Sequence, residues 1–122
     1  MSTLTISNLN DGTKTVATTN LTNGSAKCWV NFTGSSPFQI EDSFNTSSMT
    51  DNSTGRYSIA QTNNFANANY GISHGCHYEA GNGYYHSYHA KSTTAVEFLY
   101  VATSNAYVDT RDASASLNGE LA

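Results

Sequence analysis

The fold of this 122-residue chain is decided by Lys27–Ile59, KCWVNFTGSSPFQIEDSFNTSSMTDNSTGRYSI. The stretch predicts three or four short strands, because apolar residues alternate with polar ones between turns rich in Asn, Gly, Ser, Thr and Asp. In the first strand Cys28, Val30 and Phe32 point to one face. The only tryptophan of the chain, Trp29, is therefore expected on the opposite, more polar face.

Further strand signals extend on both sides of this segment. We expect strands at residues 38–40, 43–50, 56–61, 69–73, 84–89, 95–102 and 107–110, and a trailing segment at 113–122. Strands at a spacing of about 8–12 residues predict an all-β fold, a single antiparallel β-sandwich of jelly-roll-like form over residues 26–122.

Residues 95–102 give the strongest strand of the second half, because V-E-F-L-Y-V is apolar on both faces. Such a strand is expected at the centre of a sandwich or at a subunit interface. The interface residues predicted on this basis are Trp29, Val96, Phe98 and Tyr100.

The composition is poor in charge, with 11% charged residues against roughly 25% in an average soluble domain. The net charge of −4 and only five Lys and Arg argue against a nucleic-acid partner, which would need cations to neutralise phosphates. No apolar run has the length of a membrane span, and no basic region followed by an apolar core predicts a signal peptide. We therefore expect no membrane partner and synthesis in the cytoplasm.

Residues 1–25 predict an extended N-terminal arm with one weak strand at Leu4–Ile6. Ordering such a polar segment alone costs about 1–2 kcal/mol per residue in backbone entropy. We expect a partner chain to order the arm and the arm to anchor the protein; the alternative is a frayed terminus.

The histidines of the chain and one of its two cysteines gather within sixteen residues: His74, Cys76, His77, His86 and His89. These side chains are ligands for transition metals, but their spacing matches no zinc signature, and His86 and His89 should point to opposite faces of a strand. The alternative interpretation, surface or interface residues held by hydrogen bonds, is favoured, and no cofactor is expected. Cys28 reads as a small buried apolar residue, and no Cys28–Cys76 disulfide is expected.

Tyrosines also gather in this region, and aromatic rings beside polar donors can stack on sugar rings and bind their hydroxyls. The predicted glycan-contact residues are Tyr84, Tyr85, His86 and Tyr88. The alternative is that these rings form core and inter-subunit contacts.

No pattern predicts catalysis. Glu41 and Asp42 are adjacent, so on a strand they face opposite ways and cannot work as a glycosidase pair. The chain has no nucleophile elbow and no glycine-rich phosphate loop. We therefore predict no catalytic residue and no enzyme activity.

The central segment resembles one found in tail-fibre-like virion structural proteins of marine and cyanobacterial tailed phages, of the form AKAWVNFNG, DSFNVSS and TDNGTGDY. The matching residues are Ala26, Lys27, Trp29, Val30, Asn31, Phe32, Gly34, Asp42, Ser43, Phe44, Asn45, Ser47, Ser48, Thr50, Asp51, Asn52, Thr54, Gly55 and Tyr57. The resemblance covers roughly residues 1–60, and the His- and Tyr-rich stretch at 71–89 has no counterpart in it.

This resemblance implies a β-rich, homotrimeric and non-enzymatic component of the virion that contacts other virion proteins. The leading expectation is a short tail fibre or tail appendage that exposes loops to a host-surface glycan. The first alternative is a capsid decoration or head-fibre protein, which the short chain without a shaft favours. A lectin-like module unrelated to virions is the third interpretation.

Overall fold

The computed structural model describes residues 3–77 and 84–122 of the chain. Over these residues the elements are β1 (Asn8–Asn10), β2 (Thr15–Ala17), α1 (Thr18–Gly24), β3 (Ala26–Thr33), β4 (Gln39–Phe44), β5 (Thr46–Ser53), β6 (Arg56–Gln61), β7 (Gly71–Cys76), β8 (Tyr84–Lys91), β9 (Ala95–Ala102) and β10 (Ala113–Asn118).

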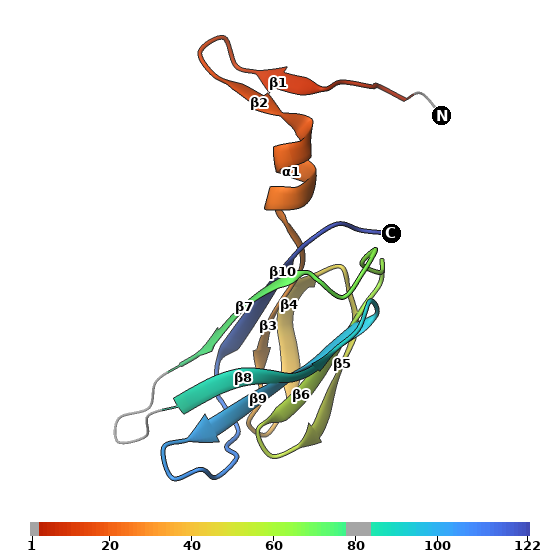
Figure 1. Cartoon of the computed structure of the whole chain (residues 1–122). Coiled ribbons are helices and arrows are strands. Elements are labelled where there is room, and N and C mark those ends of the chain that lie inside the picture. Colours follow the sequence, from red (N-terminus) through yellow and green to blue (C-terminus); the bar gives the residue numbers. More distant parts are fainter. Residues whose placement is uncertain (1–2, 78–83) are drawn as a thin grey trace.

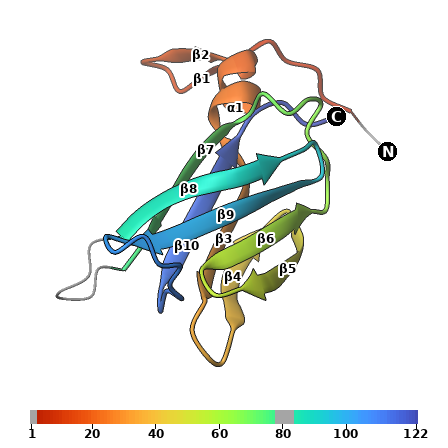
Figure 2. The same cartoon turned by 60° about the horizontal axis from the view of Figure 1, so that its bottom comes forward.

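Two four-stranded antiparallel sheets pack face to face, as Figure 2 shows. The first sheet has the order β4-β3-β10-β7, and the second has the order β5-β6-β9-β8. The first and last strands of the sandwich, β3 and β10, are neighbours at the centre of the first sheet. The prediction of a single-domain antiparallel β-sandwich is confirmed.

Alternate side chains of the four central strands fill the space between the sheets. In the strongest strand signals of the sequence, β3, β6 and β9, every second residue is buried, as the period of two along a strand requires. The core strand residues are Cys28, Val30, Phe32, Tyr57, Ile59, Val96, Phe98, Tyr100, Ala113, Ala115 and Leu117. Their burial confirms the predicted inner face of the first strand.

The prediction of a subunit interface at Val96, Phe98 and Tyr100 is wrong. These side chains are 0–1% exposed within the single chain, so no second chain can contact them. The apolar character of β9 on both faces has a different cause: its inner residues complete the core, while Leu99 and Val101 on its outer face are only partly covered. Only Trp29 of the four predicted interface residues reaches the surface.

Residues 43–50, predicted as one strand, form the end of β4 and the start of β5. Asn45 separates them with a φ of 56°, a left-handed conformation that asparagine adopts more readily than most residues. Its side-chain amide donates to Lys27 O at 2.8 Å, and its Oδ1 accepts from Asn63 N at 2.7 Å. The chain thus turns from one sheet to the other at a corner that a single side chain fixes.

The end of the chain also differs from the prediction. Residues 107–110, expected as the last strand, form only an isolated bridge between Tyr107 and Val101. Residues 113–118, expected to trail off, form β10 and pair with both β3 and β7. In the sequence A-S-A-S-L-N alanine alternates with serine, and these two residues differ little in hydropathy. The alternation is therefore too weak to predict a strand from the sequence alone.

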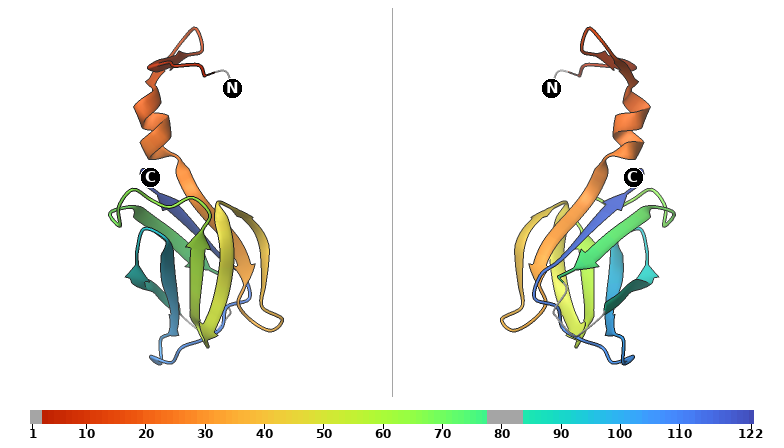
Figure 3. Two further views of the ribbon diagram at one scale, coloured as in Figure 1. Left: turned by 90° about the vertical axis from the view of Figure 1, so that its right-hand side faces the viewer. Right: turned by 90° about the vertical axis from the view of Figure 1, so that its left-hand side faces the viewer.

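The N-terminal segment projects from one end of the sandwich (Figures 1 and 3). The expectation of an extended arm with a strand at Leu4–Ile6 is wrong in its detail: β1 and β2 form a hairpin, and α1 connects the hairpin to β3. No described residue before Cys28 belongs to the core. The arm therefore depends little on the sandwich, and the sandwich needs none of its side chains.

Candidate attachment surfaces

The sandwich has two different ends. The arm and the C-terminus lie at one end, and the described loops at 34–38, 53–55 and 103–112 gather at the other (Figure 1). We call these the arm end and the loop end. The arrangement gives the molecule a direction, because a chain held by its arm presents its loop end outward.

One carboxylate connects the segments of the loop end. Asp109 Oδ1 accepts hydrogen bonds from Gly55 N at 2.8 Å and from the Tyr57 hydroxyl at 2.7 Å. The Tyr57 hydroxyl also lies 3.1 Å from Gly34 O, and Thr110 O accepts from Gly34 N at 2.7 Å. Burial, followed by the hydrogen bond to Asp109, raises the pKa of Tyr57 above its ordinary value. Asp109 thus connects three sequence-distant loops around one buried phenol.

The four predicted glycan-contact residues do not share one face. They lie on β8, an edge strand, where Tyr84, His86 and Tyr88 pair with inward-facing residues of β9. Tyr85 pairs with Val101 and therefore faces outward, where it is 64% exposed. The expected single patch is consequently divided between the open edge of the sandwich and the outer face of the second sheet.

Tyr85 instead shares a row with a tyrosine that sequence reasoning missed. Val101 pairs with Tyr85 on one side and with Tyr107 on the other, so all three lie in register on the outer face. Tyr107 is 48% exposed. Tyr107 is far from the other tyrosines in sequence, so the sequence alone does not predict that it lies near Tyr85. The two tyrosines become neighbours because the 106–110 segment pairs with β9.

The histidine cluster is also divided. The rings of His74 and His86 lie 4.8 Å apart at the opening between β7 and β8, and the His74 ring contacts the Phe98 ring at 5.2 Å. Burial and the neighbouring His86 lower the pKa of His74 to about 4. His89 lies on the outer face, as the prediction of opposite faces for His86 and His89 required, and its Nδ1 is 2.8 Å from Glu97 Oε2.

Across residues 3–77 and 84–122, no group of three or more His, Cys, Asp and Glu side chains could hold a metal ion. Both cysteines are free thiols, with Cys28 fully buried as expected and Cys76 partly buried. Desolvation raises the pKa of both thiols. This environment makes them less reactive than an exposed cysteine.

Glu97 is the centre of a polar network on the outer face of the second sheet. Arg56 donates from Nε to Oε1 at 3.0 Å and from Nη2 to Oε2 at 3.1 Å, and Asn52 Nδ2 donates at 3.1 Å. These bonds, that of Arg56 first, lower the pKa of Glu97. Both carboxylate oxygens of Glu97 therefore already have hydrogen-bond partners among the described residues.

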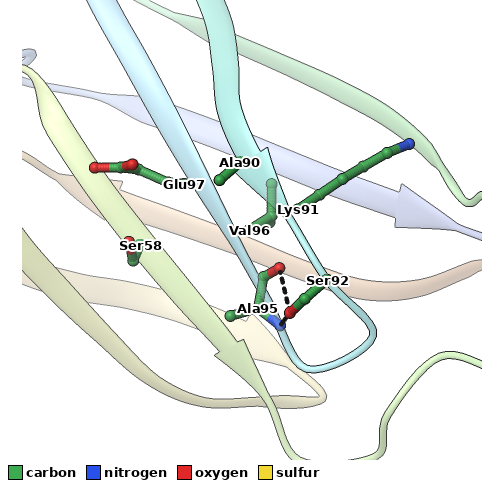
Figure 4. Close-up of a pocket in the computed structure, with 7 residues that line it drawn as sticks. All are labelled: Ser58, Ala90, Lys91, Ser92, Ala95, Val96 and Glu97. Carbon is green, nitrogen blue, oxygen red and sulfur yellow. Dashed lines mark hydrogen bonds between the residues drawn. The ribbon is translucent and has the colours of Figure 1, made fainter. Parts of the chain in front are cut away.

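A small pocket of about 250 Å³ lies beside this network (Figure 4). Its lining residues are Ser58, Ala90, Lys91, Ser92, Ala95, Val96 and Glu97. The Lys91 side chain points away from Glu97, and its Nζ donates to Tyr70 O at 3.1 Å. Ser92 Oγ is bonded to the backbone of Ala95. The polar side chains of the pocket therefore already have hydrogen-bond partners, most of them outside its lining, which leaves little for a ligand.

The arm has five exposed apolar side chains, which lie on the hairpin, on the helix and on the residues before them. Leu4 is 82% exposed, and the others are 38–45% exposed: Ile6, Leu9, Val16 and Leu21. Leu9, Val16 and Leu21 line a depression of about 310 Å³ together with polar residues of the hairpin turn.

Helix α1 is weak by itself. It has seven residues, of which three are Thr and two are Asn, and its N-cap residue makes no side-chain hydrogen bond. Threonine and asparagine are poor helix formers, and isolated helices shorter than about 12 residues are marginal in water. The residues of α1 by themselves therefore give the helix little stability.

A scan of protein-family models, a search of curated proteins and a search of solved structures each find no match to this chain. Among the described residues, no helix combines the length and the apolar character needed to cross a membrane.

Proposed function

We propose that this chain is a non-enzymatic structural protein of a tailed-phage virion, a short tail fibre or appendage component that the arm anchors and whose sandwich is displayed. The observation that carries the proposal is the arm: a hairpin and helix with exposed apolar side chains at the end opposite the loops. The resemblance of residues 26–57 to tail-fibre-like virion proteins supports the same assignment.

The physical reason for anchoring through the arm is its unmet apolar surface. Full burial of a leucine or valine side chain is worth about 1.5–3 kcal/mol. On contact with a partner Leu4, which is 82% exposed, would gain most of that amount, and the other four apolar side chains of the arm, which are 38–45% exposed, would each gain roughly half of it. The partners that we propose are two further copies of the chain, which would form a homotrimer, and a neighbouring virion protein. Contacts of this kind would supply the stability that α1 lacks.

The loop end and the adjoining outer faces would then be directed toward the host. Tyr85 and Tyr107 provide two exposed aromatic rings with hydroxyl groups in one row. Tyrosines of this kind suit a surface that is apolar over the ring and hydrogen-bonding at its tip, such as a host glycan offers. Host attachment through this row is part of the proposal.

A capsid decoration or head-fibre protein is the second candidate. The observation that favours it is the absence of a shaft: α1 is the only helix among the described residues, and it is seven residues long. A chain of this form reaches only a short distance from its attachment point, which suits a protein that covers a shell.

Position on the particle distinguishes the two candidates. A hexahistidine tag inserted after Asn105, an exposed loop residue far from the arm, can be labelled with gold on purified particles and located by negative-stain electron microscopy. Gold at the tail supports the appendage, and gold spread over the head supports decoration. A tagged protein that folds but is recovered only outside the particles would overturn both.

A further inference from the structure

The outer face of the first sheet carries an aromatic row of its own. Trp29 pairs with Phe44 on one side and with Ser116 on the other, and Ser116 pairs with Ser73. Residues that lie opposite one another in an antiparallel sheet share a face. The row therefore runs across four strands as Phe44, Trp29, Ser116 and Ser73, with Phe44 55% exposed and Trp29 partly exposed.

A shallow depression of about 450 Å³ lies over the part of this face that begins at Trp29. Its lining residues are Trp29, Val30, Asn31, Ser73, His74, Ser114, Ala115 and Ser116. None of them is Lys, Arg, Asp or Glu, and the His74 side chain points to the inner side of the sheet, where its ring contacts Phe98. The depression is therefore uncharged, and its size lies within the range of small-molecule sites, roughly 300–1,000 Å³.

Several polar groups of this face have no hydrogen-bond partner within residues 3–77 and 84–122. Asn31 Oδ1 is buried and accepts no hydrogen bond from any described residue. The hydroxyls of Ser73, Ser114 and Ser116 and the indole N–H of Trp29 make no hydrogen bond to the described residues either. The outer face of the second sheet differs in this respect, because the polar side chains around Glu97 form hydrogen bonds with one another.

We propose that this depression binds a neutral saccharide, with one face of a pyranose ring stacked on the Trp29 indole. The apolar C–H face of a sugar ring matches an aromatic surface, and its hydroxyls match the unpartnered serine hydroxyls and the Asn31 amide. Rotation of the Asn31 amide toward a sugar hydroxyl breaks no hydrogen bond of its Oδ1. The absence of a charge in the lining selects against uronic and sialic acids, whose carboxylates would lose hydration without gaining a cation.

The composition of the face favours a sugar over a second copy of the chain. Serine is depleted in protein–protein interfaces, whereas here three of the seven residues that line the depression with Trp29 are serines. The concave shape also favours a sugar over a second copy of the chain, because a depression of this size accommodates one or two sugar rings. This inference holds for any position of the chain on a particle and does not depend on the arm.

Trp29 is the only tryptophan, so its fluorescence reports on this face alone. The full chain is titrated with methyl glycosides of glucose, galactose, mannose and N-acetylglucosamine and with their disaccharides, up to about 20 mM, twenty times a 1 mM dissociation constant. Sorbitol, which has hydroxyls but no ring, and glucuronic acid serve as controls. At least one neutral sugar should shift the Trp29 emission saturably, and both controls should leave it unchanged.

Two serine variants test the location of the site. Ser73→Val combined with Ser114→Val removes two hydroxyls and keeps the fluorophore, and valine suits an exposed strand position. The dissociation constant should rise at least about fivefold, as expected for two lost hydrogen bonds. The matched control is Ser87→Val on the outer face of the second sheet, which should leave the dissociation constant unchanged.

Three results would overturn the proposal. The first is a Trp29 emission that no sugar of the panel changes, measured on protein with native circular dichroism. The second is a saturable change that the double serine variant leaves intact. The third is an emission that acrylamide cannot quench and that blue-shifts as the chain oligomerises in light scattering, because a second copy would then cover Trp29.

Discussion

Replacement of Asp109 by alanine tests whether one carboxylate holds the loop end together. Asp109 Oδ1 accepts from Gly55 N and from the Tyr57 hydroxyl, and the Tyr57 side chain is fully buried. A hydrogen bond to a charged group is worth about 1.5–3 kcal/mol, and the partial exposure of this site reduces that value. Because the Tyr57 hydroxyl keeps Gly34 O as an acceptor, the expected total loss is about 2–3 kcal/mol.

Urea denaturation followed by circular dichroism measures this loss directly, and in a domain of about 100 residues it corresponds to a fall in Tm of roughly 10–20 °C. Asp109→Asn keeps an acceptor oxygen and should lose only about 1 kcal/mol. Asp112→Ala removes an exposed carboxylate nearby and should stay within about 0.5 kcal/mol of the wild type. An alanine variant at position 109 as stable as the wild type, or an asparagine variant as unstable as the alanine one, would refute the reasoning.

Three further predictions rest on single side chains. Burial and the neighbouring His86 lower the pKa of His74 to about 4, so between pH 4 and 6.5 the unfolded chain binds the proton more tightly than the folded chain, and the free energy of unfolding should fall by roughly 2–3 kcal/mol as the pH decreases through that window. Denaturation curves of His74→Gln should lack this loss. A loss of the same size in the variant would rule out His74 as its source. Gly34→Ala would place a Cβ 2.6 Å from Tyr57 Cζ, so the Tm measured by calorimetry should fall by about 10 °C or more. A fall of less than about 2 °C would mean that the loop moves to accommodate the Cβ without loss of stability. Tyr85→Ala should leave Tm within about 2 °C because the ring is 64% exposed, while adsorption of particles to cells decreases; undiminished adsorption would exclude Tyr85 from the proposed host contact.

The parts of the fold that sequence alone could predict are those with a strong contrast between neighbours. In β3 the buried Cys28, Val30 and Phe32 alternate with Trp29, and the side on which each lies follows from a period of two. In β10 the same period joins alanine to serine, and its burial depends on the sheet that closes over it. The local pattern thus identified strands such as β3, whose own alternation of apolar and polar residues is strong, and missed β10, whose burial depends on its neighbouring strands.

The surfaces were harder to predict because they depend on which strands become neighbours. Tyr84, Tyr85 and His86 are consecutive in sequence, yet strand geometry sends them to different faces. Tyr107 joins Tyr85 only through the bridge to β9. The helix in the arm has no amphipathic pattern and poor helix formers, so nothing in residues 18–24 distinguished it from a loop.

Anchoring of the chain in a virion through its arm is tested by measuring, with quantitative mass spectrometry, how much of the chain is present in gradient-purified virions. The full-length chain is compared with residues 26–122, a form that retains the whole core and should keep its circular dichroism spectrum. Anchoring by the arm predicts a fixed copy number per virion for the full-length chain and loss of the truncated chain from the particles. Incorporation of a folded 26–122 form at the full-length level would contradict anchoring by the arm, and absence of the full-length chain from the particles would contradict the virion assignment itself.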